Sequence, residues 1–198
     1  MRGIANHILS FAAAGAEGRV FGAHELLQFG ERAAVDQALK RLAAQGELMR
    51  IARGLYTRPE TSRFGRRAPD PTLVTRDFGR REGLQIARHG AEEAHRLGLS
   101  TQVPARLVWL TSGRPATLSL EALVVVLTPA PKWLLIDPDG RAGALLRAAD
   151  WLGAEAAPDH LAAIVPALTS AEASLLLNAR GQMPGWMAQA VSLAVAHG

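Results

Sequence analysis

The stretch from residue 31 to residue 56 constrains this chain more than any other part of its sequence. Its first half places apolar residues at positions 35, 38, 39 and 42, the spacing of a helix that buries one stripe. Gly46 is then expected to end the helix, because glycine readily adopts the conformation that closes a last helical turn. Two short apolar pieces follow, Leu48–Ile51 and Leu55–Thr57, joined across Ala52-Arg53-Gly54. This arrangement predicts a small hairpin directly after the helix.

The outer face of the predicted helix is small, polar and basic. A helix that feeds an arginine-tipped hairpin is the plan of a winged helix-turn-helix, a reader of duplex DNA. Gln37 can pair with an adenine edge, while Lys40 and Arg41 can reach guanine or phosphate. The hairpin arginines would contact phosphates or the minor groove. The candidate DNA-binding residues are therefore Arg32, Ala33, Gln37, Lys40, Arg41, Arg50, Arg53 and Arg58. The alternative is that this helix and hairpin contact another protein.

The remaining sequence predicts two domains joined by a linker. Residues 1–60 would form the winged helix, with two earlier helices at about 3–14 and from Gly22 to Phe29. Residues 61–71 continue a run rich in proline and arginine, and this composition is typical of a linker. The basic surplus lies in this first part of the chain, because residues 1–70 hold 11 Arg and Lys against 7 Asp and Glu. Residues 111–198 hold 5 against 7, so the asymmetry favours a polyanion partner for the first part.

Residues 72–198 are predicted to form an α+β domain that ends in a helical segment. Short runs rich in β-branched residues between about 84 and 136 predict a small sheet, with Lys132–Ile136 as a further edge strand. From about 141 to 197 the pattern is helical, with Pro158 as the first residue of one helix. Thr169 followed by Glu172 is a capping box that opens another. The predicted fold class of the whole chain is α+β.

No motif in the sequence supports catalysis. The six histidines show no i, i+3 or i+4 pair, and cysteine is absent, so neither a metal site nor a disulfide is expected. Asp137 and Asp139 flank a proline before a glycine, which is turn chemistry first. We therefore expect no enzyme activity and no cofactor. The start of the chain lacks the clean apolar run of a secretory signal, and no run is long enough to span a membrane. We expect a soluble cytoplasmic protein.

Two strings of residues resemble a known family. Ala34 to Pro59, "AVDQALKRLAAQGELMRIARGLYTRP", is similar to the N-terminal winged helix of AbiEi-type antitoxins of type IV toxin–antitoxin systems and of the related DUF6088 proteins. Leu97 to Pro115, "LGLSTQVPARLVWLTSGRP", resembles the signature of the C-terminal domain in the same group. The resemblance implies a DNA-binding autorepressor whose C-terminal domain counteracts a nucleotidyltransferase toxin. The sequence after "TLSL" departs from that group, because it lacks the expected glycine and basic residues.

Three functions are consistent with these observations. The first is an autorepressor that binds double-stranded DNA at the promoter of its own operon and acts as an antitoxin against a nucleotidyltransferase. The second is a stand-alone transcriptional regulator whose C-terminal domain dimerises or senses a ligand. The third is a DNA-targeted enzyme, which the absence of a clustered carboxylate–lysine set disfavours. A homodimer is compatible with the first two. A nucleotidyltransferase in the neighbouring reading frame would favour the antitoxin over the solitary regulator.

Overall fold

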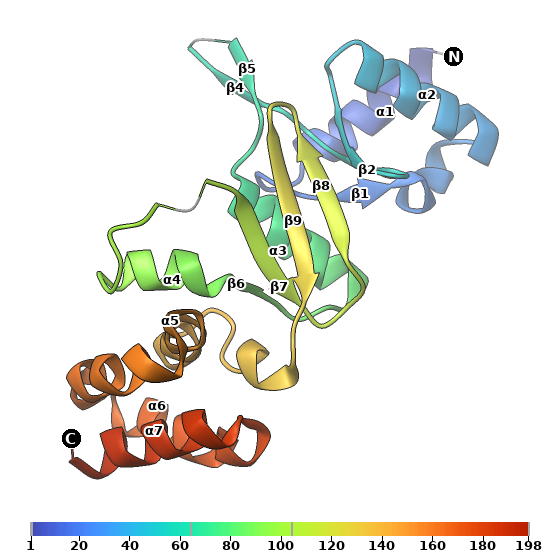
Figure 1. Cartoon of the computed structure of the whole chain (residues 1–198). Helices are drawn as coiled ribbons and strands as arrows, with labels where there is room; N and C mark the ends of the chain where they lie inside the picture. The colour runs from blue at the N-terminus through green and yellow to red at the C-terminus, as the bar shows by residue number, and fades with distance from the viewer. Residues whose placement is uncertain (1, 64, 104, 198) are drawn as a thin grey trace. The chain divides into compact units, whose positions relative to one another are not determined.

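A computed structural model describes residues 2–63, 65–103 and 105–197 of the chain (Figure 1). Its residues group into two compact units, the first made of residues 1–84 and 116–126, the second of residues 85–115 and 127–198. Both units contain helices and strands, so the chain is an α+β protein, as the sequence predicted. In the part of the chain that the structure describes, no helix combines the length and the apolar character that crossing a membrane requires.

The first unit begins with α1 (Arg2–Ala13), β1 (Phe21–Gly22), η1 (Ala23–Phe29) and α2 (Arg32–Ala44). Their apolar side chains share one buried cluster that includes Ile8, Phe21, Leu26, Val35 and Leu39. The second predicted helix, η1, is a 3-10 helix rather than an α-helix. It has only seven residues between Gly22 and Gly30, and the more extended 3-10 form spans more distance per residue.

β1 belongs to a three-stranded antiparallel sheet in the order β1-β3-β2, whose other two strands follow α2. Gly46, at φ +70°, ends the helix region, and the Glu47 amide donates back to the Leu42 carbonyl at 2.9 Å. Strands β2 (Met49–Ala52) and β3 (Leu55–Thr57) form the predicted hairpin. Its turn contains Arg53 and Gly54, and Gly54 supplies the positive φ of +75° that this turn needs. The predicted helix-and-hairpin stretch therefore folds as a helix followed by a hairpin.

The segment predicted as a linker has regular structure. Strands β4 (Glu60–Ser62) and β5 (Gly65–Arg67) pair with each other. Phe64, between them, lies outside the described residues. The hairpin offers almost no apolar side chain, and ion pairs of Arg66 with Glu47 (2.6 Å) and of Arg67 with Glu17 (3.3 Å) hold it to the first unit. The composition of the segment indicated a linker. It could not show these ion pairs, because they join residues far apart in the sequence.

Helix α3 (Pro71–Glu82) belongs to the first unit and not to the second domain that the sequence predicted. The backbone amide of Val20 donates to Asp77 Oδ2 at 2.7 Å. Gly18 lies so close to α3 that a methyl group on it would sit 2.6 Å from Leu73 Cβ. Strand β8 (Ala116–Leu120) and the start of β9 (Leu123–Pro129) complete this unit, with Leu118, Leu120 and Val125 buried. The first unit is therefore assembled from two separate parts of the sequence.

The second unit opens with β6 (Ile86–Arg88), α4 (Gly90–Arg96) and β7 (Leu107–Thr111), and β6 pairs antiparallel with β7. The end of β9 lies on the other side of β7. Residues Lys132–Leu135 form a 3-10 helix, η2, where the sequence predicted an edge strand. Trp133, Leu134 and Leu135 are all buried, whereas an edge strand would alternate between buried and exposed positions.

The chain then becomes helical. α5 (Arg141–Ile164) is followed by η3 (Val165–Ala167), α6 (Ser170–Ala179), η4 (Arg180–Gln182) and α7 (Gly185–His197). Gly153, at φ +84°, breaks α5 into two segments, so the second begins before Pro158 rather than at it. The predicted capping box of Thr169 and Glu172 is present at the start of α6. The core of this unit packs α5 against α7 and includes Leu145, Leu161, Met187 and Val191.

Candidate nucleic-acid interface

Helix α2 separates its buried and exposed residues cleanly. Val35, Leu39 and Leu42 face the core of the first unit. The five candidate residues on the helix are all exposed: Arg32, Ala33, Gln37, Lys40 and Arg41. This division follows from the 3.6-residue period, which placed apolar residues on one side only. The structure therefore places these five residues on the exposed surface of a single helix.

The cations of this surface differ in their partners. Arg32 forms an ion pair with Asp36 one turn later, with 2.9 Å between Nε and Oδ2. Lys40 and Arg41, in contrast, have no carboxylate within ion-pair distance among the residues that the structure describes. Their charges are therefore available to an anionic partner, since a carboxylate would otherwise offset them.

Arg41 also lines two hollows between α1 and α2. The larger, of about 420 Å³, has Asn6, Gln45 and Glu47 among its lining residues. The smaller, of about 180 Å³, includes Ile4 and Gln37. The Glu47 carboxylate is held by Arg66 at 2.6 Å, so it is already neutralised. Arg41 thus borders open hollows on the side of α2 that faces α1.

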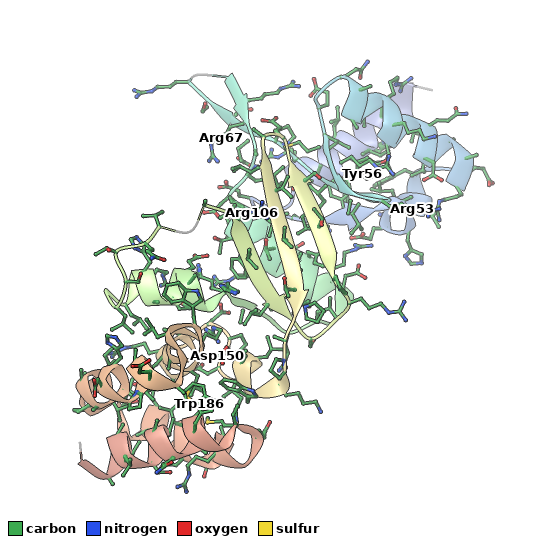
Figure 2. All side chains as sticks on the ribbon, in the orientation of Figure 1. Arg53, Tyr56, Arg67, Arg106, Asp150 and Trp186 are labelled. Atoms are coloured by element: carbon green, nitrogen blue, oxygen red, sulfur yellow. The ribbon has the colours of Figure 1, made fainter. Side chains whose placement is uncertain are left out.

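The hairpin contributes two further candidate residues and separates a third from them. Figure 2 labels Arg53, in the turn of the β2–β3 hairpin, and the buried Tyr56 on β3. Arg53 is exposed and has no ion-pair partner within the described ranges, and Arg50 is exposed on β2. Arg58 is half-buried and pairs with Glu60 at 3.2 Å. The structure therefore groups Arg50 with Arg53 and gives Arg58 a partner of its own.

Arg81 and Glu25, which sequence reasoning missed, lie near the hairpin turn. Arg81, near the end of α3, contacts Glu25 of η1 through its Nη1 atom. The same Glu25 carboxylate accepts a hydrogen bond from the backbone amide of Gly22 at 2.9 Å. No local sequence signal could have shown this contact, because Arg81 and Glu25 are 56 residues apart.

The second unit holds a buried ion pair. Arg147 donates through Nη2 to Glu93 Oε1 at 3.1 Å and to the Pro138 carbonyl at 3.0 Å, with both side chains of the ion pair buried. The pKa of Arg147 lies below its ordinary value because burial disfavours the charged form, although the hydrogen bond with Glu93 acts in the opposite direction. This pair ties α4 to α5, which is a structural role.

A hollow of about 280 Å³ in the second unit is lined by His89, Glu92 and Arg106, among others (Arg106 is labelled in Figure 2). Burial lowers the pKa of His89, whose Nδ1 atom accepts a hydrogen bond from the Ala91 amide at 3.2 Å. Burial also raises the pKa of Asp150. Among the described residues, no group of three or more histidines and carboxylates could hold a metal ion.

The remaining sequence motifs lie in ordinary loops. Asp137 accepts a hydrogen bond from the Gly143 amide at 3.3 Å and has φ +46°, as its place in a turn requires. In the stretch from Leu97 to Val103, the Gln102 amide donates to Ser100 Oγ at 3.1 Å. Pro104, which ends the "LGLSTQVP" string, lies outside the described residues.

Comparisons with known proteins identify a family and a fold. The sequence model of DUF6088, a family of unknown function, matches residues 7–168. The crystal structure of the RV2827C protein from Mycobacterium tuberculosis is similar to this chain with a TM-score of 0.53 and 17% sequence identity. The similarity covers 98% of this chain and 76% of that protein, and at this identity it shows the fold alone. None of the curated proteins compared with the chain matches it.

Proposed function

We propose that this chain, which belongs to the DUF6088 family, is a DNA-binding autorepressor and the antitoxin of a type IV toxin–antitoxin system. It binds double-stranded DNA at the promoter of its own operon. It also counteracts a nucleotidyltransferase toxin, in the manner of the AbiEi-type antitoxins that its sequence resembles. It acts in the cytoplasm and is not an enzyme.

One observation carries the DNA-binding part of this proposal. Lys40, Arg41 and Arg53 are exposed cations without a carboxylate partner in the described part of the chain. Two are exposed on a helix and the third lies in the turn of the hairpin that follows it. Phosphate groups supply the negative charge that such a surface lacks, and release of their counterions drives association.

The first unit works as a winged helix-turn-helix in this proposal. α1, η1 and α2 supply the three helical elements, and the β2–β3 hairpin is the wing. α2 enters the major groove, where Gln37 pairs with an adenine edge and Lys40 and Arg41 reach guanine or phosphate. Ala33 has no long side chain to hold the helix away from the base edges. Arg53 reaches a phosphate or the minor groove from the tip of the wing.

The antitoxin part rests on the resemblance of Leu97 to Pro115 to the AbiEi-type C-terminal domain. The second unit would carry this activity, and a homodimer would place two copies of α2 on neighbouring half-sites. A second candidate function is a stand-alone regulator in which the second unit senses a ligand. The hollow beside His89 and Arg106 favours that alternative, because it offers a small molecule both a cation and an imidazole.

Fluorescence anisotropy with labelled DNA from the promoter of the operon tests the proposal. Lys40→Ala, Arg41→Ala and Arg53→Ala should each weaken binding. Lys132→Ala is the control and should leave binding unchanged. It also removes an exposed lysine, but one that lies in the second unit and outside the proposed DNA-binding surface. Equal affinity for all four variants would contradict the assigned surface. Co-expression with the neighbouring reading frame then separates the two candidates, because an antitoxin must restore growth to cells that make the toxin.

A further inference from the structure

Helix α3 reaches the proposed wing through a continuous set of contacts. Arg81 meets the Glu25 carboxylate, and Glu25 Oε2 accepts from the Gly22 amide at 2.9 Å. Gly22 is paired with Leu55, the residue that follows the Arg53-Gly54 turn. The path from α3 to the turn thus runs through one ion pair, one hydrogen bond and one strand pair.

The packing around Gly22 shows how close these groups lie. A methyl group added to Gly22 would sit 3.0 Å from the Gly54 carbonyl oxygen and 3.3 Å from Arg81 Nη2. The turn and the guanidinium therefore lie on the same side of Gly22, and a methyl group there would require them to shift by a few tenths of an ångström. The Arg81 and Glu25 side chains are only 24% and 29% exposed, so solvent screens their attraction less than it screens a surface pair.

From these contacts we infer that Arg81 is a positioning residue for the wing: through Glu25 and Gly22 it fixes the Arg53-Gly54 turn, so that Arg53 is presented to DNA in one orientation. This role rests on the DNA binding proposed above. A tip cation held in place loses less conformational freedom when it binds than a mobile one does, and preorganisation of this kind strengthens binding without adding a contact. Arg81 itself need not touch DNA.

A double-mutant cycle distinguishes positioning from a separate contact. Arg81→Gln and Arg53→Ala should each weaken promoter binding, whereas Arg81→Gln added to Arg53→Ala should change the affinity by less than about twofold, because the tip cation that Arg81 positions is then absent. Two independent contributions would instead multiply. Arg81→Lys keeps the charge opposite Glu25 and should restore part of the affinity. Arg80→Gln is the matched control, because Arg80 is the neighbouring arginine, is 78% exposed and pairs with Asp77 of its own helix rather than with Glu25.

Hydrogen exchange provides a readout that needs no DNA. The backbone amides of residues 53–55 should exchange faster in Arg81→Gln than in Arg80→Gln, while amides of α2 remain as protected as in the wild type. If Arg81→Gln does not fold, Glu25→Gln serves in its place, because its amide oxygen can still accept from Gly22 while the ion pair is lost.

Two results would overturn this inference, namely multiplicative effects of Arg81→Gln and Arg53→Ala on affinity, or unchanged exchange in the turn. Failure of the wild-type chain to bind promoter DNA would overturn the proposed function instead. In that case the exchange measurement alone decides whether Arg81 orders the turn.

Discussion

The ion pair inside the second unit is expected to control the stability of that unit. The side chain of Arg147 is fully buried and that of Glu93 is 2% exposed. Glu93→Leu removes the carboxylate at 3.1 Å from Arg147 Nη2 and leaves a buried positive charge opposite an apolar group. Breaking a buried pair from one side costs about 3 to 5 kcal/mol, because the remaining charge lacks both water and its partner.

The double variant tests the cause of that loss. Glu93→Leu combined with Arg147→Met removes both charges, so it should cost less than the sum of the two single changes by roughly 0.5 to 3 kcal/mol. Part of the loss should remain, because the Leu134 and Pro138 carbonyls lose their donor. An unpaired buried carbonyl costs about 1 to 3 kcal/mol.

Urea denaturation followed by tryptophan fluorescence measures these changes in the free energy of unfolding for the second unit of the chain. All four tryptophans, Trp109, Trp133, Trp151 and Trp186, belong to the second unit. Glu92→Leu is the matched control, since Glu92 is 28% exposed and its pair with Arg88 should contribute only about 0 to 1 kcal/mol. A loss below about 1 kcal/mol for Glu93→Leu, or strict additivity in the double variant, would refute the reasoning.

Three further predictions concern other parts of the chain. Leu39→Ala should destabilise the first unit by about 2 to 5 kcal/mol, because Leu39 is 0% exposed in its core, and far-UV circular dichroism during thermal unfolding would detect the loss. Burial lowers the pKa of His89 and so favours its neutral form in the folded state, and the second unit should therefore lose stability as pH falls below the ordinary histidine pKa of about 6.5. His89→Gln should make the free energy of unfolding less dependent on pH in urea titrations between about pH 5 and 7. A fragment that ends at residue 62 should show no cooperative unfolding transition by circular dichroism, because it lacks α3 and the buried Leu118 and Leu120 of β8, whereas a cooperative transition would mean that these elements are dispensable.

Local patterns in the sequence predicted local structure well. The apolar spacing of Val35, Leu39 and Leu42 correctly predicted which face of α2 is buried, and Gly46 correctly marked its end. Thr169 and Glu172 form the capping box that their spacing indicated. Each of these features depends on residues within about two helical turns of one another, so a single window of sequence contains the whole signal.

Features that depend on distant residues were not predicted. The contact between Asp77 and the Val20 amide joins α3 to the first unit, and it spans 57 positions in the sequence. The β4–β5 hairpin was interpreted as a linker because its stabilising partners, Glu17 and Glu47, lie outside the segment itself. The contact between Arg81 and Glu25, which spans 56 positions, belongs to the same class. For the candidate interface, the sequence therefore predicted the exposed residues on α2 but not the contact between α3 and η1 near the hairpin turn.

The dependence of promoter affinity on salt tests the central claim most directly. If Lys40, Arg41 and Arg53 each neutralise a phosphate, the logarithm of affinity should fall linearly with the logarithm of salt concentration. The triple alanine variant should then show a slope shallower by about 2 to 3 units, since each phosphate contact contributes roughly 0.9. Wild-type affinity that does not change with salt, or a triple variant with the wild-type slope, would contradict the assignment of this surface to DNA.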